Sequence, residues 1–281
     1  MINLRSLLGL MLLAVLSMPF ANAMEWQQLD QMRQAFQQQS YRGEYLHRRG
    51  DKTSVYSVVH QFQQDESTEL LRQLDGDMVE VLRRGDQTVC YYPAGSEGAL
   101  HHAVPAAPYS QVDALDLARI SENYRAASQG MARVAGLQTH IIELSGDDWR
   151  YKHRLWLETG TNLLLQSEII DGQGNVLEQF RFTRVELNAA IRDAELVPTL
   201  KDDVEAQQQT VVRNEATAPD DRHVMTKVNW VPQGYRLTHS AHKDEDTGWM
   251  EQRTFSDGLS SFSVFVESDK GSSGQSSALA K

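Results

Sequence analysis

Three short motifs in the chain resemble catalytic signatures. Asp246-Thr247-Gly248 matches the aspartic-protease triplet, but that chemistry needs a second carboxylate to share a proton, and the sequence holds no second copy. Gly172-Gln173-Gly174 resembles the start of a phosphate-binding loop, yet a strand pattern follows where such a loop needs a helix. His101-His102 lacks further ligands at the spacing of a zinc site. We therefore expect turns at the first two motifs and a solvated histidine pair at the third.

The other common catalytic signatures are missing from the sequence. It contains no Gly-x-Ser-x-Gly elbow, no His-Glu-x-x-His helix and no paired cysteines, since Cys90 is the only cysteine. Acidic residues are numerous, so a glycosidase that uses two carboxylates stays open, although no motif supports it. The sequence thus predicts a protein that is not an enzyme and has no metal or cofactor, and it points to a binding protein.

The N-terminus has the organisation of a cleaved secretory signal, assigned to residues 1–23. Arg5 is followed by an apolar run that starts at Leu7, and Ala21-Asn22-Ala23 matches a signal-peptidase site. The run is shorter than the roughly 20 residues that span a bilayer. The net charge of -11 argues against a nucleic-acid partner and favours a basic one. These features predict export to the periplasm, with Cys90 as a small buried hydrophobe or, alternatively, a site for intermolecular pairing.

Hydrophobic periodicity predicts a helix followed by a long antiparallel sheet. Apolar residues from Trp26 to Phe36 recur at spacings of three and four, which is typical of an amphipathic helix. A period of two follows, and a short helix with Ser110 and Asp113 in a capping box interrupts it. Short turns between strands indicate a single meander of about ten strands. The expected strands are 41–48, 53–63, 67–74, 78–84, 87–92, 131–135, 139–145, 151–158, 163–170 and 175–186.

The predicted fold is α+β and mainly antiparallel β, with a large N-terminal domain and a smaller β-rich C-terminal domain. We assign 24–200 to the large domain, 201–221 to a polar linker and 222–281 to the small domain. The small domain has strand patterns at 225–230, 235–241, 249–255 and 260–267. Because four strands make a poor independent core and a Gly/Ser-rich tail follows, we expect this domain to be truncated.

A strongly curved sheet of this length has a concave face, for which two interpretations stay open. If it is apolar and incompletely filled, it forms a cleft for an acyl chain or an extended peptide. If the helix fills it, the domain has an ordinary two-layer core. Both faces of 53–63 and 163–170 carry apolar residues, which fits a sheet covered on both sides.

Several ordered segments resemble the MucB/RseB family of periplasmic regulators. They are ELLRQLDGDMVEVLR from Glu69, HRLWLETGTNLLLQSEIIDGQGNVLEQFRFT from His153, WVPQGY from Trp230 and FSDGLSSFSVFVE from Phe255. The resemblance runs over nearly the whole chain after the signal and involves no catalytic residue. It implies an open half-barrel similar to LolA-type lipoprotein carriers, with a small domain packed beside it.

The resemblance also implies a function. Such proteins bind the periplasmic domain of a membrane anti-sigma factor, RseA or MucA, and protect it from site-1 proteolysis. The envelope-stress sigma factor then stays inactive until lipopolysaccharide or another lipid releases the regulator. A homodimer is compatible with this picture, and the alternative is a periplasmic lipid or lipoprotein carrier. Because aromatic and Arg side chains dominate binding hot spots, the candidate partner contacts are Trp230, Tyr235, Arg236 and Trp249, with core packing left open for both Trp.

Overall fold

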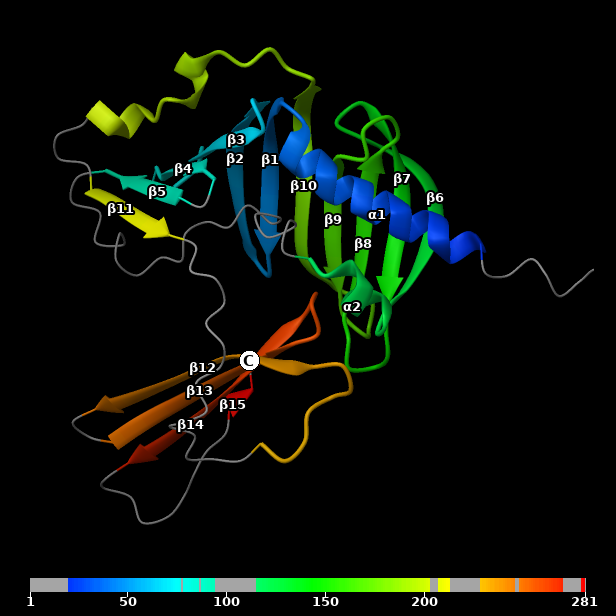
Figure 1. The fold of residues 1–281 in the computed structure, drawn as a ribbon, viewed down its shortest axis with the longest axis vertical. Helices are drawn as coiled ribbons and strands as arrows, with labels where there is room; N and C mark the ends of the chain where they lie inside the picture. Colours follow the sequence, from blue (N-terminus) through cyan, green and yellow to red (C-terminus); the bar gives the residue numbers. More distant parts are fainter. Residues whose placement is uncertain are drawn as a thin grey trace, which may run out of the picture.

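The computed structural model describes residues 20–76, 78–85, 87–93, 115–202, 207–212, 228–245, 248–269 and 279–280. These residues form an 11-stranded sheet and a separate 4-stranded sheet, and the small sheet lies below α2 in Figure 1. All strand pairs in both sheets are antiparallel. The predicted fold class, an open and mainly antiparallel sheet with few helices and a smaller β-rich domain, is confirmed.

The large domain contains α1 (Phe20–Gln38), β1 (Tyr41–Arg49), β2 (Lys52–Gln63), β3 (Glu66–Gln73), β4 (Glu80–Arg84), β5 (Gln87–Tyr92), α2 (Leu117–Ser121), β6 (Arg125–Val134), β7 (Leu137–Ser145), β8 (Lys152–Glu158), β9 (Leu164–Ile170), β10 (Val176–Leu187), η2 (Asp193–Leu196), η3 (Thr199–Asp202) and β11 (Gln207–Val212). The small sheet contains β12 (Arg236–Glu245), β13 (Gly248–Ser256), β14 (Ser261–Asp269) and β15 (Leu279–Ala280).

The large sheet consists of two meanders, so the prediction of a single meander is wrong. Its strand order is β11-β5-β4-β3-β2-β1-β10-β9-β8-β7-β6. The second meander therefore starts at the far edge with β6 and returns to the middle, where β10 pairs with β1. This pairing places aromatic residues of β1 beside those of β10. Because these residues are buried together, pairing of β10 with β1 is favoured over an arrangement in which the second meander continues next to β5.

Helix α1 crosses the sheet in front of β10 to β6 (Figure 1). Its side chains Leu29 and Met32 are 1% and 2% exposed, and they pack on a cluster that includes Ile142, Leu144 and Leu157. This confirms the predicted amphipathic stripe. The helix begins at Phe20, before the predicted cleavage site, and residues 1–19 of the predicted signal lie outside the described residues.

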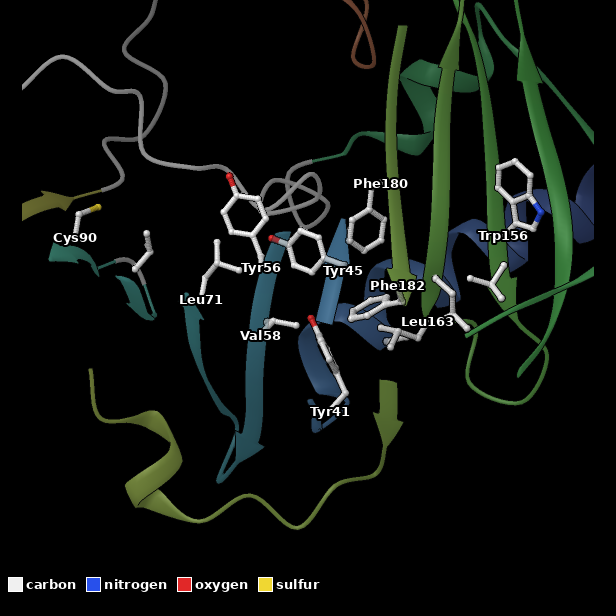
Figure 2. Packing of buried hydrophobic residues seen from close by; sticks show 14 of the residues in the cluster. Tyr41, Tyr45, Tyr56, Val58, Leu71, Cys90, Trp156, Leu163, Phe180 and Phe182 are labelled. Carbon is white, nitrogen blue, oxygen red and sulfur yellow. The ribbon is translucent and has the colours of Figure 1, made fainter. Parts of the chain in front are cut away.

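An aromatic cluster fills the middle of the large domain (Figure 2). Tyr45 stacks on Tyr56 with ring centroids 5.2 Å apart, and its ring lies 4.9 Å from that of Phe180. Phe182 contacts Phe180 and Tyr41 edge to face. Burial raises the pKa of both Tyr41 and Tyr45, so their hydroxyls stay neutral. These contacts favour the interpretation in which packed side chains occupy this part of the interior.

Gly43 allows β1 to approach β10 closely, and we expect Gly43→Ala to lower the free energy of unfolding by about 1–3 kcal/mol. A Cβ at this position would lie 2.4 Å from the carbonyl oxygen of Arg184 and 2.9 Å from the ring of Phe182. Urea unfolding tests this, with Gly172→Ala as the control, because a Cβ there meets nothing within 4 Å. Equal midpoints for the two variants would contradict the close-approach explanation.

A second layer covers the opposite face of β2 to β5. Leu196 and Leu200, from η2 and η3, pack with Val59, Leu70 and Leu82. Together with the aromatic cluster this covers both faces of β2, as its sequence predicts. Beyond η3, β11 pairs with β5 within the region predicted as a linker. The linker prediction missed this strand because QQQTVV has little apolar character.

Other boundaries differ from the predictions. β6 starts at Arg125, six residues before the predicted strand. Residues 228–230 are not in a strand, and 225–227 lie outside the described residues. β14 pairs with β15 through Val264 and Phe265, and β15 lies in the Gly/Ser-rich tail, where no strand was predicted. His101-His102, Asp246-Thr247 and the capping box at Ser110 lie outside the described residues.

Candidate partner-binding surface at the domain joint

A rigid turn of the small domain, Asp257 to Ser260, connects β13 to β14. The buried carboxylate of Asp257 accepts hydrogen bonds through Oδ1 from the backbone N–H groups of Leu259, at 3.0 Å, and Ser260, at 2.8 Å. Gly258 has a φ of 106°, a conformation that L side chains rarely adopt. The sequence Asp-Gly therefore fixes the shape of this turn.

The same turn inserts into the large domain. Asp257 Oδ2 accepts a hydrogen bond from the Tyr124 hydroxyl at 3.0 Å and one from Arg150 Nε at 2.9 Å. Leu259 packs against the apolar cluster beneath α1 and α2, and Arg119 donates to the Ser256 carbonyl. We call these contacts the domain joint: the turn 257–260 with Arg119, Tyr124 and Arg150. The two domains thus share an apolar contact and a buried ion pair.

Arg150 is the centre of the joint on the side of the large domain. Its guanidinium binds Asp147 at 2.6 Å and the Gln233 carbonyl, and it lies over the rings of Tyr124 and Tyr235, 5.7 and 5.2 Å from their centroids. Burial alone would lower the pKa of Arg150, but the carboxylates of Asp147 and Asp257 outweigh it and raise the pKa. The guanidinium is therefore firmly charged and engages both domains.

Three titratable side chains pack around this ion pair. Burial, with a smaller contribution from Asp257, raises the pKa of Tyr124 well above its ordinary value and that of Tyr235 to about 12. The ring of His153 lies 6.0 Å from that of Tyr124, edge to face. Burial lowers the pKa of His153 to about 4, and its Nε2 has no hydrogen-bond partner among the described residues. All three side chains are neutral at pH 7.

The four predicted partner contacts occupy different environments. Trp230 is 63% exposed, and its ring lies 5.2 Å from that of Trp149, which is 64% exposed and belongs to the large domain. Tyr235 is buried in the joint, Arg236 is exposed at the start of β12, and the half-buried Trp249 stacks on His242. The structure thus places Trp230 and Tyr235 at the joint and leaves Arg236 and Trp249 on the small sheet.

Sequence reasoning missed Trp149, Arg150 and Asp257. Asp257-Gly258 is a recognisable turn signal, but nothing in the sequence pairs Asp257 with a residue 107 positions earlier.

Gly172-Gln173-Gly174 lies in a hairpin turn, as predicted, since Asp171 accepts hydrogen bonds from the backbone of Gln173 and Asn175. Among the described residues, no three metal-ligating side chains cluster and no helix is long and apolar enough to span a membrane.

Comparison with known proteins gives relatives that regulate sigma factors. The chain is 29% identical over 260 residues to the sigma factor AlgU regulatory protein MucB of Pseudomonas aeruginosa, covering 91% of this chain and 78% of the relative. It is 25% identical over 247 residues to the sigma-E factor regulatory protein RseB of Haemophilus influenzae, covering 85% and 75%. These relatives match along both domains of the chain.

Solved structures and family models agree with these relatives. The P. aeruginosa MucA/MucB complex matches with a TM-score of 0.69 and 26% identity, covering 89% of this chain and 82% of that one. MucB in complex with MucA(peri) matches with a TM-score of 0.68 and covers 88% and 81%. Residues 24–200 match the MucB/RseB N-terminal domain and residues 221–281 the MucB/RseB C-terminal domain. The chain therefore belongs to the MucB/RseB family.

Proposed function

We propose that this protein binds the periplasmic domain of a membrane anti-sigma factor, protects it from site-1 proteolysis and so keeps an envelope-stress sigma factor inactive. The observation that carries the proposal is the similarity, over 89% of the chain, to MucB in its complex with MucA. The predicted secretory signal supports a periplasmic location, where the anti-sigma domain is accessible. Catalysis has no part in this function.

Trp230 is the strongest of the proposed partner contacts. A large aromatic side chain that is 63% exposed loses apolar surface to water when a partner covers it, which is the usual basis of a binding hot spot. Arg236 is also exposed, and Trp249 keeps part of its surface accessible. Tyr235 is 8% exposed and contacts Arg150, so we assign it an indirect role in which it supports the joint.

We expect Trp230→Ala to weaken partner binding by about 30-fold, which corresponds to a hot-spot loss of about 2 kcal/mol. The measurement is fluorescence anisotropy with a labelled peptide from the periplasmic domain of the anti-sigma factor of the same organism. Trp156→Phe is a suitable control, because Trp156 is 8% exposed and belongs to the core, so it should leave affinity unchanged. Unchanged affinity in Trp230→Ala would remove Trp230 from the contact surface.

Release by lipopolysaccharide or another lipid is the second part of the proposal. Membership of the MucB/RseB family supports it, since the resemblance carried by the sequence implies release by lipid. The same anisotropy titration at fixed salt, repeated with lipopolysaccharide, should show displacement of the peptide. Lipid binding without any peptide binding would favour the alternative, a lipid or lipoprotein carrier. Homodimer formation stays a prediction that sedimentation velocity can test.

A further inference from the structure

We propose that Asp257 and Arg150 are positioning residues for partner binding, because they seat the turn 257–260 in the large domain and thereby hold Trp230 beside Trp149. The effect on binding rests on the proposed function, whereas the effect on domain placement does not. Neither residue needs to touch the partner. Their role is to make exposed groups from two domains into one continuous surface.

The turn is held in shape by hydrogen bonds within the small domain. Asp257 uses Oδ1 entirely within the turn, on the N–H groups of Leu259 and Ser260. Its other oxygen, Oδ2, points out of the turn and accepts the hydrogen bonds from Tyr124 and Arg150. One carboxylate therefore fixes the turn and also joins it to the large domain. A rigid turn loses little conformational freedom on docking, which favours a well-defined seated position.

The ion pair makes seating an all-or-none event. In the seated position the side chains of Asp257 and Arg150 are 0% and 2% exposed. If only one partner is removed, the other charge stays buried without its counter-ion, so the seated arrangement loses its advantage over a separated one in which water solvates that charge. Interfaces of this kind exchange between discrete arrangements and do not deform gradually.

Two glycines show how closely the surfaces fit at the joint. A Cβ on Gly258 would lie 3.0 Å from Cγ1 of Ile120, which is fully buried in α2. A Cβ on Gly234 would lie 2.1 Å from Oδ1 of Asn123. Both glycines belong to the small domain and both neighbours to the large domain. The fit therefore depends on the absence of side chains at these two positions.

The joint controls the Trp149–Trp230 contact through short backbone connections. Trp149 directly precedes Arg150, and its N–H donates to Asp147, the residue that also binds the Arg150 guanidinium. Trp230 lies three residues before Gln233, whose carbonyl accepts a hydrogen bond from Arg150. Because both Trp residues are this close to the contacts of Arg150, unseating the turn separates their rings. The Trp230 surface is then no longer adjacent to the large domain.

The test compares the full chain with Gly258→Ala, which strains the turn and crowds it against Ile120 without changing any charge. Two Trp rings at 5.2 Å give an exciton couplet in circular dichroism, and Trp149→Phe identifies its contribution. We expect Gly258→Ala to lose the couplet and to bind the anti-sigma peptide about tenfold more weakly, since affinity falls with the fraction of competent protein. The control is Gly174→Ala, because Gly174 also has positive φ, 90°, but a Cβ there meets nothing. It should keep the couplet and the affinity.

A charge cycle provides an independent test. Arg150→Met leaves Asp257 unpaired and should lose the couplet and the affinity, whereas Arg150→Met combined with Asp257→Asn should recover part of both. A couplet and affinity that persist in Gly258→Ala and in Arg150→Met would overturn the proposal. Loss of the couplet without loss of affinity would overturn the positioning role. If the wild-type chain binds no peptide while the variants lose the couplet, the proposed function fails and the domain joint stands.

Discussion

Replacing Glu80 by Ala is expected to lower the free energy of unfolding by about 3–5 kcal/mol. Glu80 is the first residue of β4, and its side chain is fully buried against the segment that carries η3. Its Oε1 accepts a hydrogen bond from Arg72 Nε at 2.6 Å, and its Oε2 accepts one from the Leu200 N–H at 2.8 Å. The substitution leaves a cavity and removes the acceptor for both donors.

The pKa of Glu80 is shifted downward, as expected for an ionised carboxylate that anchors two hydrogen-bond donors. Burial alone would raise the pKa, but the hydrogen bonds from Leu200, Thr199 and Arg72 outweigh it and lower the pKa. The folded protein therefore favours the ionised carboxylate more than the unfolded chain does. The resulting stabilisation is present above the ordinary glutamate pKa and is lost as the pH falls below it.

Urea unfolding of Glu80→Ala can be compared with Glu186→Ala, which removes an exposed carboxylate. Glu186 forms an ion pair with Arg42, but its side chain is 58% exposed, so its loss should cost less than about 1 kcal/mol. Similar losses in the two variants would contradict the anchoring role of Glu80.

Proteolysis should also show the segment around Leu200 cleaved first in Glu80→Ala, because that segment loses its attachment to β4.

The second large effect is a loss of about 3 kcal/mol of stability as the pH falls from 6.5 to 4, caused by His153. Burial lowers the pKa of this imidazole from 6.5 to about 4, against weaker opposing contributions from Asp257 and Glu178. The folded protein therefore keeps His153 neutral in a range where the unfolded chain takes up a proton. Because the unfolded chain binds more protons in this window, acid favours unfolding.

His153→Gln should remove most of this dependence while keeping a side chain of similar size. Urea midpoints measured at pH 7, 6, 5 and 4 separate the two proteins: the wild-type midpoint should fall through the whole range, and that of His153→Gln should be nearly flat above pH 5. Above pH 5 the His153 contribution changes while that of Glu80 is still fully present, so the two contributions can be distinguished there. Parallel pH profiles for both proteins would show that His153 is accessible to water in the folded state.

The sequence predicts local structure in this protein well, because local patterns determine it. The stripe from Trp26 to Phe36 predicts α1, and alternation predicts β2 and β8 almost to their ends. The pairing of β1 with β10 was not predictable, since it joins residues more than a hundred positions apart and replaces a simpler continuation of the meander. β11 was missed because backbone pairing with β5, and not an apolar stripe, keeps it in the sheet.

The candidate site was only partly predictable for the same reason. Composition identifies Trp230 as an aromatic residue suited to binding, and the structure shows its ring exposed. The importance of Asp257 depends on Arg150 and Tyr124, which reach it only after both domains have folded. Tyr235 is the reverse case, since a side chain suited to partner binding is used inside the joint.

The most direct test of the proposed function is a cleavage time course. The periplasmic domain of the membrane anti-sigma factor of the same organism is incubated with its site-1 protease, with and without this protein at saturating concentration. We expect the wild-type protein to slow cleavage strongly at saturation, and added lipopolysaccharide to restore the cleavage rate. At a concentration that only partly saturates the anti-sigma domain, we expect Trp230→Ala to protect it less than the wild-type protein does. Cleavage at an unchanged rate in the presence of the bound protein would contradict a protective role.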